Sequence, residues 1–301
     1  MTITPEAAVD AANEVFGRHP GRRAFHAKGT LCRGTFTATP GAARLTRAAH
    51  MQGDPVPAQV RVSNGSGDPN APDNVPDIRG LAVKFELPDG STSDIVAQSL
   101  PWFSFHDPDG FIEFVLAQRR TPSIAWRFPA YLTKHPQMLG ALRVNGPALR
   151  VPASYATLRY YGVHAFRLLS SDGGSRYVRY EWAPADGDRR IGLRDARSRS
   201  RDFLQQEFRE RLARGAARFT LELQIAAPGD TVDDPATRWP AERERIVAGT
   251  LEITAADDEA DENALVFDPA NVTDGIELSA DPVLQFRPRA YSESAARRMK
   301  P

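Results

Sequence analysis

The residues of this sequence that most often do chemistry are six histidines and one cysteine, and their spacing matches no common catalytic or metal-binding motif. No two histidines lie four residues apart, so no helix face presents a pair of imidazoles to a zinc ion. The sequence also lacks a P-loop, a dinucleotide-binding glycine fingerprint after a strand, and a Gly-x-Ser-x-Gly elbow. Short motifs therefore leave the reaction open.

The single cysteine, Cys32, excludes an internal disulfide and any zinc or iron–sulfur site built from several thiolates, and it agrees with a reducing compartment. The 38 basic residues balance 38 acidic ones, which argues against a nucleic acid or an anionic membrane as the main partner. Residues 1–6 show no secretory signal, and no stretch approaches the roughly 18 apolar residues that span a bilayer. These features predict a cytoplasmic protein.

The elements that must position any site begin with a predicted helix over residues 4–17. Thr4 suits the N-cap, Pro5 suits the first helical position, and Gly17 suits the end of the helix. With 301 residues, of which 41% are apolar, the chain can form two domains or one large β-barrel domain.

Short strand-like runs follow between residues 28 and 105. They are separated by turn clusters rich in Gly, Pro, Asn and Asp. The runs are 30–38, 58–63, 80–87, 94–98 and 102–105. Because no helical crossover separates them, we expect an antiparallel sheet.

The second half of the chain mixes helices with further strands. Helical sequence over 110–148 is interrupted by Pro122, Pro129 and Pro136. Strands are predicted at 163–169, 176–182, 219–227 and 250–254, and helices at 200–212 and 241–248. A loop is predicted at 230–240, and an acidic, solvent-exposed loop at 255–263. The pattern indicates an α+β fold around a barrel or curled sheet.

Longer strings, in a fixed order, carry more information than these short motifs. They are RAFHAKG at 23–29, VRVS at 60–63, DIRGLAVKF at 77–85, PWF at 101–103, HDP at 106–108, VPASY at 151–155, GVHAF at 162–166, WP at 239–240, FDP at 267–269 and RPRAY at 287–291. In their residues and in their order along the chain, these strings resemble those of the haem-dependent catalase family. The resemblance covers residues from about 18 to 298.

The resemblance implies an antiparallel β-barrel core of the haem catalase type, with inserted and flanking α-helices and haem between barrel and helices. It implies one catalase-core domain over 1–301, with the short helix at 4–17 and the barrel and helices at about 18–298. Because full-length members of the family are much longer, the chain looks like the compact catalase-related peroxidase branch.

On one side of the haem, the resemblance assigns the axial iron ligand to Tyr291. A phenolate suits ferric iron, and a neighbouring guanidinium favours the ionised phenol. Arg287, one helical turn earlier, matches the family's arginine partner. His164 and Asp281 match the hydrogen-bonded groups behind that arginine, which tune the iron without touching it.

On the opposite side, the resemblance assigns the distal acid–base group to His26, with Ser63 as its hydrogen-bond partner. The family has a distal asparagine where this sequence has Gln98, which carries its amide about 1.5 Å further out. Ser104 replaces a second aromatic residue. Both departures predict that hydrogen peroxide is positioned less well than in an efficient catalase.

Three arginines, Arg23, Arg61 and Arg298, match the residues that pair with haem propionates, since a guanidinium fork fits a carboxylate. Phe103 and Phe111 match aromatic residues over the haem plane and in the access channel. Each of these residue types is also common on ordinary surfaces or in ordinary cores.

The function implied is that of a haem b peroxidase in oxidative stress, which reduces organic hydroperoxides with a small organic donor and hydrogen peroxide weakly. A homodimer is compatible with this interpretation. The alternatives are a fatty-acid hydroperoxide rearranging enzyme and a non-catalytic haem-binding stress protein. Cys32 as an axial thiolate is a further alternative, but it lies only six residues after His26, so one segment would have to serve both haem faces.

Overall fold

The computed structural model describes residues 3–119 and 124–299. Its centre is an antiparallel barrel of eight strands, joined in the order β1-β2-β3-β4-β5-β7-β8-β9 and closed between β9 and β1. The strands of the barrel are β1 (Gly29–Ala38), β2 (Val56–Asn64), β3 (Arg79–Glu86), β4 (Thr92–Gln98), β5 (Tyr160–Tyr161), β7 (Ser175–Pro184), β8 (Ala217–Ile225) and β9 (Arg245–Ala256). Strands β6 (Phe166–Leu169) and β10 (Ile276–Leu278) extend the sheet beside β7. The predicted antiparallel α+β fold is confirmed.

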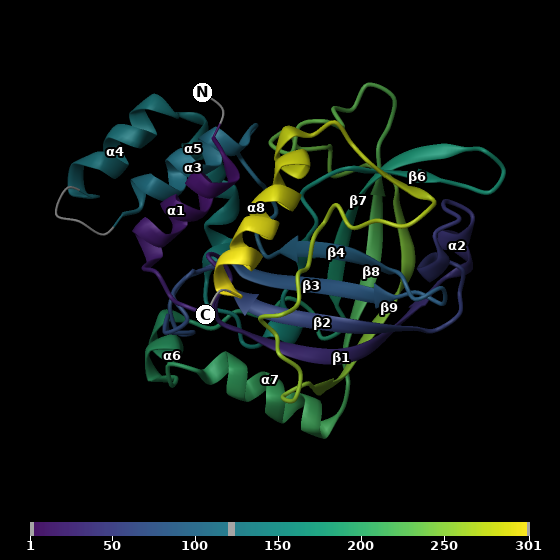
Figure 1. Cartoon of the computed structure of the whole chain (residues 1–301), viewed down its shortest axis with the longest axis horizontal. Coiled ribbons are helices and arrows are strands. Elements are labelled where there is room, and N and C mark those ends of the chain that lie inside the picture. Colours follow the sequence, from purple (N-terminus) through teal and green to yellow (C-terminus); the bar gives the residue numbers. More distant parts are fainter. Residues whose placement is uncertain (1–2, 120–123, 300–301) are drawn as a thin grey trace.

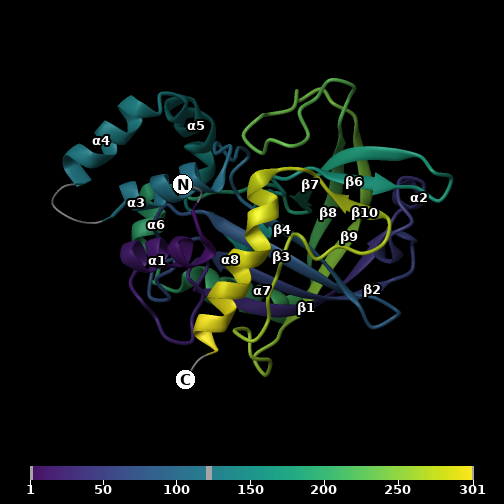
Figure 2. The same ribbon diagram turned by 45° about the horizontal axis from the view of Figure 1, so that its top comes forward.

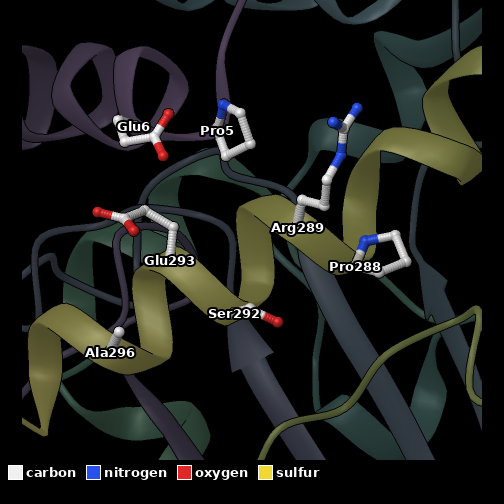
Figure 3. Close-up of a pocket in the computed structure, with 7 residues that line it drawn as sticks. All are labelled: Pro5, Glu6, Pro288, Arg289, Ser292, Glu293 and Ala296. Carbon is white, nitrogen blue, oxygen red and sulfur yellow. The ribbon is translucent and has the colours of Figure 1, made fainter.

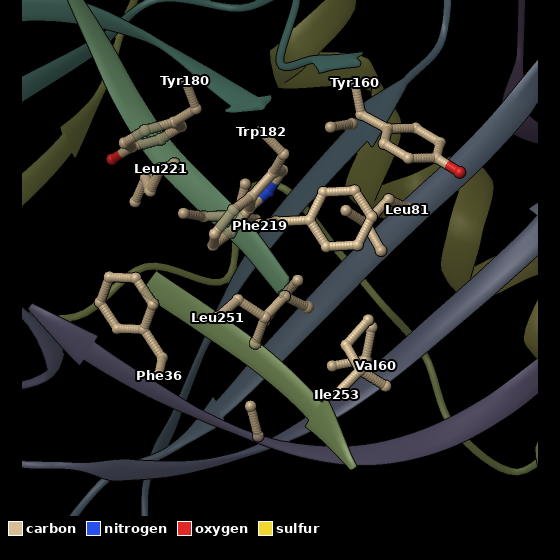
Figure 4. Close-up of a cluster of buried hydrophobic side chains, with 14 of the residues drawn as sticks. Phe36, Val60, Leu81, Tyr160, Tyr180, Trp182, Phe219, Leu221, Leu251 and Ile253 are labelled. Atoms are coloured by element: carbon tan, nitrogen blue, oxygen red, sulfur yellow. The ribbon is translucent and has the colours of Figure 1, made fainter. Parts of the chain in front are cut away.

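Apolar side chains fill the inside of the barrel, as Figure 4 shows for Phe36, Trp182, Phe219 and Leu251. Successive residues of a strand point to opposite faces of the sheet. On β2, Val60 and Val62 are therefore part of the core, whereas Arg61 and Ser63 face the outside of the barrel. Polar groups on these strands thus gather on one outer face.

Helices cover this outer face. In both Figure 1 and Figure 2 the long helix α8 runs between the barrel strands and the helices α1 and α3. The α-helices are α1 (Pro5–Phe16), α2 (Pro40–Ala43), α3 (Pro108–Ala117), α4 (Ile124–Lys134), α5 (Gln137–Asn145), α6 (Leu193–Ser198), α7 (Phe203–Arg214) and α8 (Pro282–Arg298). Ala8, Ala11, Ile112 and Phe286 pack together where α1, α3 and α8 meet. No helix among the described residues is long and apolar enough to cross a membrane.

The first helix ends where the sequence predicts. The Thr4 side chain accepts a hydrogen bond from the backbone N–H of Ala7, Pro5 is the first helical residue, and Gly17 follows the helix with a φ of 90°. That φ lies in the left-handed region, where glycine carries no steric penalty. Local capping chemistry is sufficient to define this element.

Two predicted elements are wrong. Residues 102–105 form no strand, because Trp102 follows Pro101 and its backbone carbonyl accepts a hydrogen bond from Asn145 rather than from a neighbouring strand. The helix predicted at 241–248 is replaced by the start of β9, in which Ile246 is paired with Leu223 of β8. Pairing with a long neighbouring strand overrides a weak local helix preference.

The prolines of the helical segment act differently from one another. Pro136 separates α4 from α5 as predicted. Pro129 lies inside α4 and does not end it, contrary to prediction. Pro122 lies outside the described residues.

Candidate active site

Four side chains form an unbroken chain of hydrogen bonds that ends on the phenol of Tyr291. Nε of Arg287 donates to the Tyr291 oxygen at 2.9 Å, and Nη2 of the same guanidinium also contacts it. Nη1 of Arg287 lies 2.8 Å from Nε2 of His164, whose Nδ1 lies 2.6 Å from the carboxylate of Asp281. The four residues that the family resemblance places together are therefore in contact.

The protonation of His164 follows from its partners. A guanidinium only donates hydrogen bonds, so Nε2 of His164 must accept the hydrogen bond from Arg287. The ring proton therefore lies on Nδ1, which donates a hydrogen bond to the carboxylate of Asp281. Complete burial lowers the pKa of His164, and the charge of Arg287 acts in the same direction. The imidazole is therefore neutral. Because it is hydrogen-bonded to Asp281 on one side and to Arg287 on the other, the carboxylate fixes the orientation of the ring and the ring fixes that of the guanidinium.

Asp281 is anchored by the helix it begins. It is 1% exposed, and its carboxylate accepts the backbone N–H groups of Val283 at 2.8 Å and Leu284 at 3.1 Å. These bonds satisfy donors that the first turn of α8 leaves free. One carboxylate thus caps α8 and orients the chain that leads back to Tyr291 on the same helix.

His26 lies outside the barrel in the segment before β1, with Nδ1 at 3.0 Å from the Ser63 hydroxyl. Ser63 is paired with Gly80 across β2 and β3. A Cβ at position 80 would lie 2.9 Å from Nδ1 of His26 and 2.7 Å from the Ser63 hydroxyl. Only glycine leaves space for the imidazole against this part of the sheet.

Desolvation, together with the charges of Arg61, Arg287 and Arg23, lowers the pKa of His26 to about 3. The imidazole is therefore neutral and can accept a proton at ordinary pH. The backbone N–H of Ala24, two residues before His26, donates to the Ser294 hydroxyl of α8 at 3.4 Å, so the His26 segment lies on the side of the barrel that α8 covers. The His26 group and the Tyr291 group thus face a common region.

Gln98 is paired with Gly80 across β3 and β4, so it belongs to the same row of the sheet as Ser63. Its carboxamide is bonded to the backbone of Leu100 at both ends: Nε2 donates to the carbonyl at 2.9 Å, and Oε1 accepts the N–H at 3.1 Å. Gln98 makes no hydrogen bond with His26 in the described part of the chain. Its amide is held by the main chain instead.

The three arginines assigned to propionates converge on residues 262–265. Nε of Arg61 donates to the Glu262 carboxylate at 3.0 Å, while Arg23 and Arg298 both donate to the carbonyl of Leu265, at 2.8 and 3.0 Å. Burial, reinforced by the charges of Arg61 and Arg298, lowers the pKa of Arg23 to about 9. Positive charge therefore exceeds negative charge in this buried cluster.

This cluster fits the carboxylates of a haem. Arg61 is 4% exposed, and its Nη2 is buried with no hydrogen-bond partner in the described structure. A buried guanidinium nitrogen without a hydrogen-bond partner is costly, so an anionic partner is expected at Nη2. A Cβ at Gly29 would lie 2.5 Å from the same Nη2, so glycine is also needed beside it.

Aromatic rings supply an apolar wall. The centroids of Phe103 and Phe111 lie 5.8 Å apart, and Phe25, next to His26 in sequence, is 5.8 Å from Phe111. The Phe103 ring is 6.5 Å from His164, which connects this wall to the Tyr291 chain. A phenol held by a guanidinium, an apolar wall and a cationic rim together match the chemistry of a ferric haem and its two carboxylates.

Two open hollows of the surface lie away from this site. Figure 3 shows one between the first turn of α1 and the outer side of α8, lined by Glu6, Arg289 and Glu293 among others. A second lies beside Leu149 and Leu193. Neither is lined by His26 or Tyr291, so neither adds to the site described above.

Two residues of this site were not identified from the sequence. Gly80 supports His26, and its only local signal is its place in the DIRGLAVKF string. Glu262 lies in a run of acidic residues that we expected to be solvent-exposed, yet it binds the buried Arg61. Nothing in the local sequence separates Glu262 from its acidic neighbours.

Comparisons with known proteins agree with this geometry. A family model described as Catalase matches residues 14–301. The chain is 46% identical over 294 residues to a catalase-related peroxidase of Mycolicibacterium paratuberculosis, covering 97% of this chain and 94% of that protein. It is 33% identical over 307 residues to a catalase-related peroxidase of Synechococcus elongatus, covering 99% and 89%. A crystal structure of a fungal catalase matches with a TM-score of 0.83 and 25% identity, over 94% of this chain and 60% of the fungal chain.

Proposed function

Because the chain belongs to the catalase family, we propose that it is a haem-dependent peroxidase in which Tyr291 binds the iron and His26 moves the protons of the peroxide. The observation that carries this proposal is the pairing of a guanidinium-held phenol with a neutral, partly buried imidazole on the side of the barrel that α8 covers. A phenolate and a base on opposite sides of an iron are what peroxide cleavage needs.

The haem would be held by Tyr291 at the iron, by Arg23, Arg61 and Arg298 at the carboxylates, and by the wall that includes Phe103. When bound, it supplies the iron at which the O–O bond is cleaved. The proposed type is haem b, which is not linked covalently. The only cysteine, Cys32, is fully buried in the barrel core and cannot form a thioether to a group on the outer face. Its free thiol also supports a cytoplasmic location.

Proton transfer is the task of His26. Nδ1 faces the Ser63 hydroxyl, which leaves Nε2 as the nitrogen that can take a proton from one peroxide oxygen and return it to the other. The low pKa of His26 keeps the base in its neutral form before the reaction. In the net reaction ROOH and two hydrogen equivalents from the donor give ROH and water.

The preferred peroxide is proposed to be an organic hydroperoxide. Because the Gln98 carboxamide is bonded to Leu100 at both ends, it is poorly placed to orient a molecule as small as hydrogen peroxide. The buried side chain at position 104 is a small serine, which leaves more room than an aromatic ring. A site that positions one substrate poorly loses rate with it even when that substrate binds.

The test uses the haem-loaded protein. Absorbance spectra before and after peroxide addition report the iron and its reaction, and an oxygen electrode reports catalase turnover. We expect donor oxidation with alkyl hydroperoxides and weak oxygen release from hydrogen peroxide. Oxygen release at the rate of an efficient catalase would contradict the proposed preference. Consumption of a lipid hydroperoxide without donor would instead indicate a rearranging enzyme.

A further inference from the structure

His26 occupies an unfavourable backbone conformation that its surroundings must maintain. Its φ is 55°, and it is the only residue other than glycine with a positive φ in the described structure. A non-glycine residue in this region persists only where neighbouring contacts hold it. The N–H of His26 donates to the carbonyl of Gly65 at 3.1 Å, and that of Ala27 donates to Ser66 at 3.0 Å.

Asp73, in the connection between β2 and β3, joins the surroundings of His26 to a distant helix. Its carboxylate is fully buried; Oδ1 accepts a hydrogen bond from Asn64 at 2.7 Å and forms an ion pair with Nζ of Lys28, also at 2.7 Å. Oδ2 accepts the N–H groups of Leu204 at 3.0 Å and Gln205 at 3.4 Å, in the first turn of α7. The N-cap residue of α7 makes no side-chain capping bond, so Asp73 takes that role from 131 residues away.

These contacts close into a ring of buried and partly buried hydrogen bonds. The hydroxyl of Tyr155 donates to Asn64 at 2.7 Å, and the amide of Gln205 donates to the same hydroxyl at 2.6 Å. Asp73 completes the ring by bonding both Asn64 and the backbone of Gln205. A fully satisfied buried network specifies one geometry, because every alternative leaves a polar group unpaired.

The ring is connected to the His26 site through Asn64, which is a member of it, and through Lys28, which is paired with Asp73. Asn64 directly follows Ser63, the partner of His26, and Lys28 lies two residues after His26. The backbone also joins these points, because the N–H of Asn64 donates to the carbonyl of Lys28 at 2.9 Å. Asp73 therefore holds both the strand that presents Ser63 and the segment that presents His26.

We propose that Asp73 is a positioning residue for His26. The inference rests on the proposed role of His26 as the acid–base group. Removing the negative charge of Asp73 leaves Lys28 with the exposed Asp202 as its remaining carboxylate partner and weakens the hold on Asn64. The His26 segment can then relax from its strained backbone, and the imidazole moves relative to the peroxide.

The chain contains a matched control. Lys84 and Asp94 form a second buried pair, also with a shortest distance of 2.7 Å, and the side-chain exposures are 12% and 0% against 11% and 0% for Lys28 and Asp73. Asp94 binds the backbone N–H of Asp268 and the amide of Asn271, and no residue around His26. Asp94→Asn therefore removes an equivalent charge from a pair that does not contact the His26 segment.

The experiment compares the haem-loaded Asp73→Asn, Asp94→Asn and His26→Ala variants with the parent. Stopped-flow absorbance gives the rate constant for reaction with peroxide, and hydrogen–deuterium exchange reports the backbone around His26. We expect Asp73→Asn to keep its haem, to react with peroxide about tenfold more slowly, and to exchange faster at His26 and Ala27. Asp94→Asn is expected to match the parent in both measurements.

Each other outcome is informative. If Asp73→Asn does not fold, Lys28→Met removes the second partner of the pair and is expected to cause the same loss and the same exchange. The inference would be overturned if Asp73→Asn, or Lys28→Met in its place, showed the same rate constant and the same hydrogen exchange as Asp94→Asn. An unchanged rate in His26→Ala would contradict the proposed function instead, so the two failures are distinguishable.

Discussion

The Tyr291 side and the His26 side of the candidate site are built in different ways. On the Tyr291 side, Asp281, Arg287 and Tyr291 all belong to the start or body of α8, and only His164 comes from another element. On the His26 side, strand pairing with β3 brings Ser63 and Gln98 into one row, and the imidazole contacts Ser63 from the segment before β1. One side depends on the period of a helix, the other on the register of a sheet.

This difference indicates where variation is tolerated. In a chain of four hydrogen-bonded groups we expect a change at any member to disturb the others, because each orients the next. A row of a sheet can accept a different side chain at one position without moving the others, as Gln98 illustrates by bonding to Leu100. We therefore expect the iron chemistry to be set on the Tyr291 side and the substrate preference on the His26 side.

The largest expected effect is on haem binding. Tyr291→Phe removes the phenol oxygen that the Arg287 guanidinium binds and that is proposed to ligate the iron, so most of the haem should be lost or its Soret band should shift. Pyridine haemochrome assay and absorbance spectra measure both. Tyr177→Phe, on β7, is the control. An unchanged spectrum and haem content in Tyr291→Phe would falsify the assignment.

The next effect is on rate alone. His26→Ala should retain haem but react with peroxide roughly two to four orders of magnitude more slowly, because it lacks the acid–base group. Stopped-flow mixing with an alkyl hydroperoxide measures this, with His135→Ala as the control. If His26→Ala lost its haem while Tyr291→Phe lost only rate, the proposed roles of the two sides would have to be exchanged.

A smaller change is expected at Gln98. Gln98→Asn shortens the side chain by one methylene, so it can no longer bond to both backbone groups of Leu100 in the same way. The freed amide should raise oxygen release from hydrogen peroxide several-fold, up to about tenfold, with an unaltered Soret band. Gln224→Asn, on β8, is the control. No gain at the oxygen electrode would show that the length of this side chain is not the limit.

The smallest expected effect is the response to pH. A base must be unprotonated to act, and because the pKa of His26 is lowered to about 3, its reactive form is complete well below neutral pH. The rate constant for peroxide should stay constant from about pH 8 to about pH 5 and fall only as the pH approaches 3. Stopped-flow rates across this range test it. An inflection near pH 6.5 would mean that the His26 imidazole is solvated like a free histidine and that its pKa is not lowered.

Much of the fold could be predicted from local patterns. Short β-rich runs between turn clusters identified β2 and β3, and alternating residues identified β7, each to within about two residues, while Thr4 and Gly17 marked the ends of α1. The errors arose where tertiary pairing decides, as at the start of β9, where Ile246 pairs with β8. A short segment with weak preferences takes the conformation of its neighbour.

The site divides in the same way. The spacing of Arg287 and Tyr291 is a property of the sequence, because residues four apart share one face of a helix. The contact of Glu262 with Arg61, the turn of Gln98 toward Leu100 and the space left by Gly80 have no comparable local signal. Each of these three features depends on how segments of the chain are aligned with one another in the folded structure.

By itself, the sequence determined the groups available for chemistry and the elements that carry them: a phenol and a guanidinium one helical turn apart, and a histidine ahead of an antiparallel sheet. Only the tertiary structure decided which group meets which. The physical reason is that strand register and helix packing are set by burial of the whole core, which joins residues as distant as Asp73 and Leu204. No local pattern of side chains encodes that offset.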